Sequence, residues 1–223
     1  MCYHVSTPSK KKLKEILPDV NLLDYDARRE INGFDHTTLP VLLNSEADRI
    51  QGAIWGFLPF FIKAADIRET MNKTLNARCE TVFSSPMFKQ AARKNRCLVM
   101  VDGFFEWQHA KQNGKIEKVK YFIERADQKA FPIGGLWSRY GTGDEAVLTC
   151  NLITTPANAL MSEIHNSTKR MPFVIPEASW GLWLDEQQPA DQVQELMQPL
   201  EEGILVAHPV IDPKEGIREN TLF

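Results

Sequence analysis

The stretch Cys97-Leu98-Val99-Met100-Val101-Asp102-Gly103-Phe104-Phe105-Glu106-Trp107 decides the fold that the sequence predicts. Residues 97–101 form a continuous apolar run, which is typical of a strand buried on both faces. Gly103 indicates a β-bulge, and residues 104–108 continue the strand beyond it. We therefore expect a buried sheet at the centre of the fold.

The segments on either side of this strand alternate between further strands and a few helices. Serine or threonine in front of an apolar-periodic segment predicts a helix start, most clearly at Ser9 and at the Ser85-Pro86 and Thr155-Pro156 pairs. The Asn113-Gly114 pair predicts a hairpin loop. The predicted strands are 39–43, 50–58, 119–125, 132–139, 146–154, 171–175 and 204–208, and the predicted helices are 9–17, 85–95, 155–165, 177–184 and 191–197. Mostly antiparallel strands with peripheral helices predict one α+β domain over residues 1–223.

Length and charge narrow the class of protein. A chain of 223 residues can bury one substantial core. Its net charge of −3 argues against a protein that coats nucleic acid non-specifically. No apolar run is long enough to span a membrane, and lysines follow the N-terminus almost at once, so we expect a cytoplasmic protein. The four cysteines lack metal-ligand spacing, so no metal, cofactor or disulfide framework is expected.

Cys2 follows the initiator methionine directly, and removal of Met1 would leave it as the N-terminal residue. Such a residue is a 1,2-aminothiol, whose amine and thiol have unperturbed pKa values of about 8 and about 8.5. The pair can condense with an aldehyde through nitrogen and close a thiazolidine ring through sulfur. The alternative is that Cys2 merely begins an edge strand.

Three stretches place charged or amide side chains where the apolar pattern predicts core. Functional sites are expected at such local conflicts. The stretches are 74–81 with Asn76, 101–107 with Glu106, and 162–172 with His165 at a helix end. Burial among aromatic residues would raise the pKa of Glu106 toward that of a usable acid or base. A structural ion pair at Glu106 and a purely structural His165 remain open alternatives.

Taken together, these stretches resemble the SRAP family, the SOS-response-associated peptidases or abasic-site processing proteins. The resemblance covers nearly the whole chain, because the motifs occur in the family's order and rough spacing. The motifs are Met1-Cys2, Asn76-Ala77-Arg78-x-Glu80-Thr81, Asp102-Gly103-Phe104-Phe105-Glu106-Trp107, His165 with Arg170-Met171-Pro172, and His208-Pro209-Val210.

The resemblance implies a small β-barrel-like sheet and covalent capture of abasic sites in single-stranded DNA through Cys2. It implies that Asn76, Glu106 and His165 complete the active site. Asn76 and His165 would supply a donor that opens the sugar ring, and Glu106 would accept a proton from the Cys2 amine. The product would be a DNA–protein crosslink that protects the strand, and family members also remove the residues before the cysteine.

The resemblance further implies DNA contacts. Arg78 looks like a phosphate contact, and we expect Lys169 and Arg170 to grip phosphates as well. Phe61 and Ile62 stand where relatives carry paired tryptophans, so bases are expected to stack there. His4 replaces an arginine that is usual in the family, and the histidine motif is lengthened before Arg170. We expect a monomer, with the replication machinery as a candidate protein partner.

Two other classes of function stay open. An N-terminal-nucleophile amidotransferase also begins with a processed cysteine, but it would not require the motifs of Glu106 and His165. A non-enzymatic reader of single-stranded DNA junctions would need only the basic and aromatic segments. Glutaminase activity would favour the first, and DNA retention independent of Cys2 would favour the second.

Overall fold

The computed structural model describes residues 2–22, 26–112 and 115–210. Its helices are α1 (Lys10–Ile16), α2 (Ile67–Lys73), α3 (Lys89–Lys94), α4 (Ala159–Ile164), α5 (Trp180–Leu184) and α6 (Ala190–Leu196). Its strands are β1 (His4–Ser6), β2 (Asn21–Leu22), β3 (Ile31–Asn32), β4 (Thr38–Leu43), β5 (Glu46–Trp55), β6 (Asn76–Arg78), β7 (Arg96–Val101), β8 (Gly103–Gln112), β9 (Lys115–Arg125), β10 (Phe131–Tyr140), β11 (Val147–Cys150), β12 (Leu152–Pro156), β13 (Arg170–Pro172) and β14 (Leu205–Pro209).

A closed ring of five strands forms the centre of the molecule. The strands pair in the order β11-β10-β7-β4-β5, and a parallel pairing of β5 with β11 closes the ring. Every residue of β7 is buried, which agrees with the apolar run that the sequence shows there. The predicted barrel-like sheet is thus confirmed, and β7 is the middle strand in this order.

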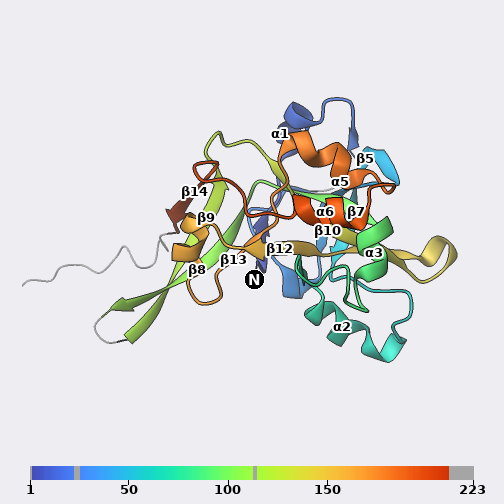
Figure 1. Cartoon of the computed structure of the whole chain (residues 1–223), viewed down its shortest axis with the longest axis horizontal. Coiled ribbons are helices and arrows are strands. Elements are labelled where there is room, and N and C mark those ends of the chain that lie inside the picture. Colours follow the sequence, from blue (N-terminus) through green and yellow to red (C-terminus); the bar gives the residue numbers. More distant parts are fainter. Residues whose placement is uncertain (1, 23–25, 113–114, 211–223) are drawn as a thin grey trace, which may run out of the picture.

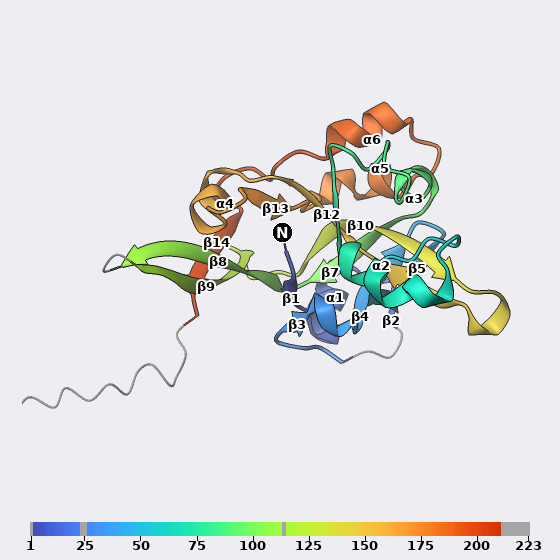
Figure 2. The same ribbon diagram turned by 90° about the horizontal axis from the view of Figure 1, so that it is seen from below.

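A second sheet carries the chain's N-terminal strand. Its order is β14-β9-β8-β1-β3, and β1 pairs with β8 through Val5 and Phe104. The long β8–β9 hairpin extends away from the rest of the molecule, and β1 lies near the middle, between that hairpin and α2 (Figures 1 and 2). Cys2, the first described residue, is therefore buried in the fold close to the start of β1.

A three-stranded sheet, in the order β13-β12-β6, completes the set of strands in the described part of the chain. The pairing of β6 with β12 is parallel, whereas β12 and β13 are antiparallel. Helices α3, α5 and α6 lie together on one side of the molecule (Figure 2). Trp183 of α5 is buried and donates its indole N–H to the carbonyl of Cys97 in β7, at 2.9 Å. This contact anchors the peripheral helices to the barrel.

Several predicted elements are confirmed. Ser9 caps α1 by accepting the N–H of Lys12 at 3.2 Å. The predicted strands at 39–43, 97–101, 132–139 and 204–208 correspond to β4, β7, β10 and β14. The predicted strand 119–125 lies within the longer β9. Asn113 and Gly114 lie outside the described residues, but the flanking Gln112 and Lys115 pair across the hairpin.

Other predicted boundaries are wrong. The segment at 155–156 ends β12 instead of beginning a helix, and Asn158 caps α4 by accepting the N–H of Met161. The segment at 85–86 forms a turn, in which the Ser85 carbonyl accepts the N–H of Lys89, so α3 begins later than predicted. Near residue 85 the predicted capping residue forms a turn, and near residue 155 the helix cap is Asn158 instead of the predicted residue.

The predicted strands 146–154, 50–58 and 171–175 are also shorter or divided. Asn151 separates β11 from β12. Its side-chain Oδ1 accepts the N–H of Leu136 in the neighbouring β10, and its backbone N–H donates to the Leu136 carbonyl. Gly56 ends β5 with a φ of 135°, a conformation that favours glycine. Beyond β13, a single bridge joins Val174 to Ile133. The short strands β2 and β3 lie between the predicted helix 9–17 and the predicted strand 39–43, where the sequence predicts no strand.

Gly103 is required for close packing instead of a bulge. It begins β8 and pairs with Ser6, and a Cβ atom at this position would lie 2.4 Å from the Phe122 ring. Such a distance is far shorter than any normal carbon contact, so a larger residue would push β8 and β9 apart.

In the described part of the chain, no helix has both the length and the apolar character needed to cross a membrane.

Candidate active site

Cys2 lies directly before β1, and its side chain is 1% exposed. Burial raises the pKa of the Cys2 thiol well above its ordinary value, and the nearby charge of Glu106 raises it further. The thiol is therefore neutral near pH 7. The sequence had suggested partial ionisation from the unperturbed value, and desolvation in the fold is the reason for the difference.

Asn76 reaches Cys2 from β6. Its side-chain Nδ2 donates a hydrogen bond to the carbonyl oxygen of Cys2 at 2.8 Å, and both residues are buried. The Oδ1 atom of Asn76 is also buried, yet it accepts no hydrogen bond from the described residues. Asn76 thus fixes the backbone of Cys2 and still presents one acceptor, which is costly unless a donor arrives there.

Glu106 stands in β8 with a side chain that is 4% exposed. Burial raises the pKa of this carboxyl from its ordinary 4.5 to about 8. Its Oε1 atom has no hydrogen-bond partner among the described residues. The prediction that this carboxyl is desolvated is confirmed, and Glu106 mostly carries its proton at pH 7.

His165 follows α4 as its C-terminal cap residue and is 6% exposed. Its Nδ1 lies 2.8 Å from the carbonyl oxygen of Arg170. A carbonyl can only accept, so Nδ1 carries the proton and Nε2 of the neutral ring carries a lone pair. Burial lowers the pKa of His165, which keeps the ring neutral near pH 7.

The pKa shifts of Glu106 and His165 favour proton transfer in the direction opposite to the one that the resemblance implies. The Nε2 atom of His165 lies 3.8 Å from Oε2 of Glu106. In the resting state Glu106 holds a proton and Nε2 can accept one, whereas the sequence assigned acceptance to Glu106 and donation to His165. The cause is burial, since desolvation favours the neutral form of both groups.

Four residues from distant parts of the chain thus meet: Cys2, Asn76, Glu106 and His165. Together they offer a thiol, a buried acid, a neutral imidazole and an amide acceptor. Within residues 2–22, 26–112 and 115–210, no group of three histidine, cysteine or acidic side chains is placed to hold a metal ion. The arrangement is suited to proton transfer around a nucleophile at Cys2.

Three of the residues predicted to bind DNA are exposed: Arg78, Phe61 and Lys169. Arg78 ends β6 two residues after Asn76, so both side chains belong to the same face of the strand. The guanidinium of Arg78 makes no hydrogen bond or ion pair with any described residue, although the Arg78 carbonyl accepts the N–H of Thr81 at 3.2 Å. Phe61 is 53% exposed and packs edge-on against Phe60, with their ring centroids 5.5 Å apart. Ile62 is half-buried, and its carbonyl accepts the hydroxyl of Tyr140 at 2.9 Å.

The remaining predicted DNA contacts differ in their surroundings. Lys169 is exposed, with a left-handed φ of 50°. His4 is half-buried, and its Nδ1 lies 2.8 Å from Oε1 of Glu30, which also binds Lys120 at 2.6 Å. Glu30 therefore offsets the positive charge of Lys120 and occupies Nδ1 of the His4 ring, which is then not available to a phosphate.

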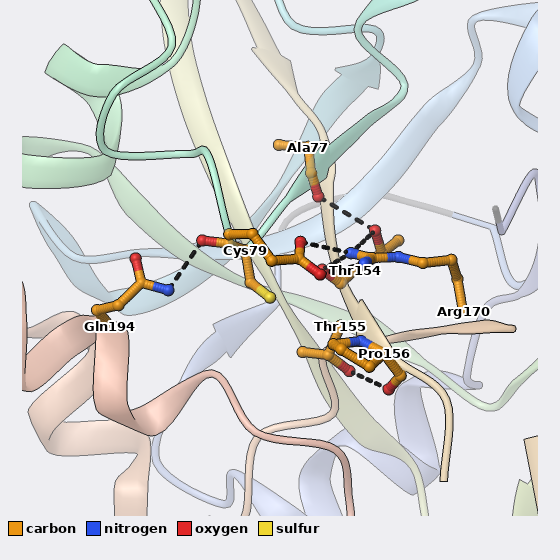
Figure 3. Close-up of polar contacts among 8 residues, drawn as sticks. Ala77, Cys79, Thr154, Thr155, Pro156, Arg170 and Gln194 are labelled. Atoms are coloured by element: carbon orange, nitrogen blue, oxygen red, sulfur yellow. Dashed lines mark hydrogen bonds and ion pairs between the residues drawn. The ribbon is translucent and has the colours of Figure 1, made fainter.

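Arg170 is turned inward and does not have the exposure that a phosphate contact needs. It is 8% exposed, and its guanidinium forms an ion pair with Glu80. It also donates to the carbonyl oxygen of Thr154 at 2.6 Å, and Thr154 in turn contacts Ala77 (Figure 3). The expected phosphate contact at Arg170 conflicts with this geometry. The guanidinium already joins β13 to Thr154 in β12 and to Glu80, two residues after β6.

Sequence reasoning missed two side chains beside His165. Thr168 places its hydroxyl oxygen 2.8 Å from Nε2 of His165. Asn166 bonds to the backbone of His109 in β8. Both residues lie in the stretch 162–172 that the sequence singled out, but their partners are defined only by the folded loop.

The family profile described as SOS response associated peptidase (SRAP) matches residues 1–213. The chain belongs to the SRAP family. This match confirms the resemblance that the motifs carried.

Relatives in this family bear the same descriptive name in several organisms. Abasic site processing protein YoqW of Bacillus subtilis (strain 168) is 29% identical over 174 residues, which are 77% of this chain and 74% of that protein. Abasic site processing protein HMCES of Mus musculus is 27% identical over 195 residues, which are 75% of this chain and 53% of that protein. The chain is therefore similar to SRAP proteins of both bacteria and animals.

Solved structures share the SRAP fold. A crystal structure of a protein from Bacteroides thetaiotaomicron superposes with a TM-score of 0.84 at 28% identity, covering 95% of this chain and 93% of that one. A second, from Bordetella bronchiseptica, gives a TM-score of 0.80 at 22% identity, covering 94% and 100%. The mixed α+β architecture with its five-stranded barrel is thereby established for this chain.

Proposed function

We propose that this SRAP protein, once Met1 is removed, captures abasic sites in single-stranded DNA covalently through Cys2. The observation that carries the proposal is the convergence of Asn76, Glu106 and His165 on Cys2. The relatives' name, abasic site processing protein, supports the choice of substrate. The second sheet holds Cys2 and Glu106 through β1 and β8, and the three-stranded sheet holds Asn76 in β6 and, through β13, the loop that follows His165.

The proposed reaction needs no redox partner. The opened sugar of an abasic site carries an aldehyde at C1′. The neutral Cys2 amine attacks that carbon, and loss of water gives a Schiff base. The Cys2 sulfur then adds to the C=N carbon, and the thiol proton moves to nitrogen, which closes a thiazolidine ring. The aldehyde is consumed, so β-elimination and strand breakage are suppressed.

Protonation in the site supports this order of steps. Because burial keeps the Cys2 thiol neutral, the amine is the first nucleophile and the sulfur follows. Glu106, with its pKa of about 8, can give a proton to the sugar ring oxygen or to the departing water. His165 Nε2 can accept one, and Asn76 Oδ1 can accept a hydrogen bond from the amine.

The surroundings of the site support binding of a single strand. Arg78 offers a guanidinium without a described partner on the face of β6 that also bears Asn76. Phe60 and Phe61 are exposed aromatic rings on which bases can stack. Lys169 adds a second exposed cation next to the loop that carries His165. We keep Arg78, Phe61, Ile62 and Lys169 as proposed DNA contacts.

Two further activities belong to the same proposal. While Met1 is attached, the Cys2 nitrogen is part of an amide and is not nucleophilic. Removal of Met1 converts it into the free amine that the reaction needs. Self-removal of Met1 would also account for the word peptidase in the family description. Action within the replication machinery remains a prediction from the resemblance.

An oligonucleotide with a single abasic site tests the proposal on a denaturing gel. The wild-type protein should give a shifted band that survives denaturation, whereas Cys2→Ala should give none. Cys2→Ser keeps the amine but lacks sulfur, so its adduct should appear only after trapping with borohydride. A form that retains Met1 should give no stable adduct without borohydride, because its N-terminal residue is not a 1,2-aminothiol and cannot close the thiazolidine.

Persistence of the stable adduct in Cys2→Ala would overturn the mechanism. Equal retention of intact and abasic DNA by all variants would instead identify a non-covalent reader of single strands. Glutamine hydrolysis without any crosslink would identify an amidotransferase. Each of these readings uses the same purified proteins, so the three functions can be compared directly.

A further inference from the structure

We infer that the loop between α4 and β13, residues 166–169, is a positioning device for His165, in which Thr168 holds the ring and Asn166 holds the loop. This inference rests on the proposed function, because it concerns proton transfer in the crosslinking reaction. It assigns a role to side chains that lie outside the four residues meeting at Cys2.

The imidazole of His165 is held at both ring nitrogens. The Arg170 carbonyl accepts from Nδ1 at 2.8 Å, which leaves a lone pair on Nε2. The Thr168 hydroxyl lies 2.8 Å from that lone pair and donates to it. A ring bound at both nitrogens has one orientation and one tautomer, so the position of the Nε2 lone pair is defined.

Asn166 fastens the loop to the strand that carries Glu106. Its Oδ1 accepts the N–H of His109 at 3.1 Å, and its Nδ2 donates to the His109 carbonyl at 3.0 Å. The side-chain amide thus replaces a neighbouring strand at the edge of β8. His109 lies three residues after Glu106, so the two reacting side chains are carried by directly joined segments.

The backbone of the loop closes on His165 itself. The carbonyl of His165 accepts the N–H of Lys169 at 2.8 Å, and the Lys169 carbonyl accepts the N–H of Ala157 at 3.0 Å. This closed turn places Thr168 next to the imidazole ring of His165. The short separation in sequence is therefore what allows one hydroxyl to reach Nε2.

The distance between His165 and Glu106 explains why such control matters. At 3.8 Å, Nε2 and Oε2 are too far apart for a direct hydrogen bond. An oxygen of the sugar can act between them only if both groups keep their positions. In the resting state the Thr168 hydroxyl occupies the Nε2 lone pair, and rotation of the hydroxyl hydrogen about the Cβ–Oγ bond frees that lone pair for a substrate proton; the same oxygen can then accept from Nε2 once the nitrogen is protonated.

Three variants of the exposed loop test the role of Thr168 in single-turnover crosslinking of abasic DNA. Thr168→Val removes the hydroxyl and should slow the reaction at saturating DNA by about 3- to 10-fold, the range expected for one hydrogen bond. The apparent DNA affinity should not change. Thr168→Ser should restore the wild-type rate. Ser167→Ala, an adjacent hydroxyl without a contact to any described residue, serves as the matched control and should match wild type.

The decisive comparison is made in a His165→Ala background. If Thr168 acts through His165, adding Thr168→Val should slow that variant no further, because coupled residues are not additive. Imidazole ¹⁵N chemical shifts should show the Nδ1–H tautomer in both proteins, because the Arg170 carbonyl still accepts from Nδ1, whereas the Nε2 shift should change in Thr168→Val because its hydrogen bond is lost.

Two results would overturn the inference: an unchanged rate in Thr168→Val, or the same loss with and without His165. Because wild type must crosslink abasic DNA for any rate to be measured, failure of the proposed function is recognised separately. In that case the Nε2 chemical shift still tests the contact between Thr168 and His165. Equal thermal unfolding of Thr168→Val, Thr168→Ser and wild type is the control for folding.

Discussion

Oε2 of Glu106 and Nε2 of His165 lie 3.8 Å apart, and both side chains are buried. Burial favours the neutral carboxylic acid and the neutral imidazole, so the pair holds a transferable proton on Glu106 and a lone pair on His165. A substrate oxygen between them could receive a proton from one and return a proton to the other.

The crosslinking rate should depend on pH through Glu106. Since its pKa is raised to about 8, the acid form is lost as the pH rises through that value, and the rate should fall there. Glu106→Gln should be slower by about 10²–10⁴ and should lack this alkaline decrease. Single-turnover rates from about pH 5.5 to about pH 9 give both curves. A decrease near pH 8 that persists in Glu106→Gln would assign it to another group.

The free energy of unfolding should also depend on pH through the carboxyl of Glu106. The folded protein keeps a proton on Glu106 that the unfolded chain loses above pH 4.5. Wild type should therefore be most stable relative to Glu106→Gln below pH 4.5 and should lose that stability as the pH rises to about 8. A shift from 4.5 to about 8 sets an upper bound of about 5 kcal/mol on this change. Urea unfolding of both proteins across this range measures it, and a constant difference would contradict the assignment.

Asn76 should be needed as a hydrogen-bond donor. Asn76→Asp keeps the shape but places a carboxylate oxygen against the Cys2 carbonyl, where Nδ2 now donates at 2.8 Å. We expect a loss of about 1–3 kcal/mol in the free energy of unfolding, since the carbonyl is left unsatisfied. Asn21→Asp, at an exposed position in β2, is the matched control for the added charge. Similar unfolding curves for the two variants would show that the bond contributes little.

Arg78 and Arg170 should fail in different ways when each is changed to Met. Arg170→Met removes the pair with Glu80 and the bond to Thr154, and we expect a loss of about 1–3 kcal/mol in stability. Arg78→Met should leave stability within about 0.5 kcal/mol but weaken DNA binding and reduce the salt slope by about 1. Filter-binding titrations at several salt concentrations, together with urea unfolding, separate the two outcomes. A reduced salt slope in stably folded Arg170→Met would restore it as a phosphate contact.

Lys169 offers a test in which charge and backbone strain are separated. Its φ of 50° is unfavourable for a residue with a side chain and ordinary for glycine. Lys169→Gly should therefore be more stable than Lys169→Ala by about 1 kcal/mol, while both should weaken DNA binding equally. Unequal DNA affinities would mean that the shape of the loop, and not the lysine charge, controls binding.

The sequence by itself determined the family and the chemical inventory of the site. The apolar run at β7, the cap at Ser9 and the ordered motifs around Asn76, Glu106 and His165 depend on local pattern, which a single chain shows directly. The burial of Glu106 could also be read locally, because Phe104, Phe105 and Trp107 surround it in the sequence. The true starts of α3 and α4 could not, because turn and helix compete for the same capping residues.

Only the tertiary structure decided which proton belongs to which group and which cations remain available to DNA. Desolvation depends on every neighbour that excludes water, so the shifted pKa values of Glu106 and Cys2 follow from packing and not from residue type. The inward turn of Arg170 follows from Glu80, which lies 90 residues earlier in the chain. Likewise, Thr168 acquires its contact with His165 because the loop closes on the histidine carbonyl. Sequence specifies which groups are present, whereas the fold sets the distances and the dielectric surroundings that govern their chemistry.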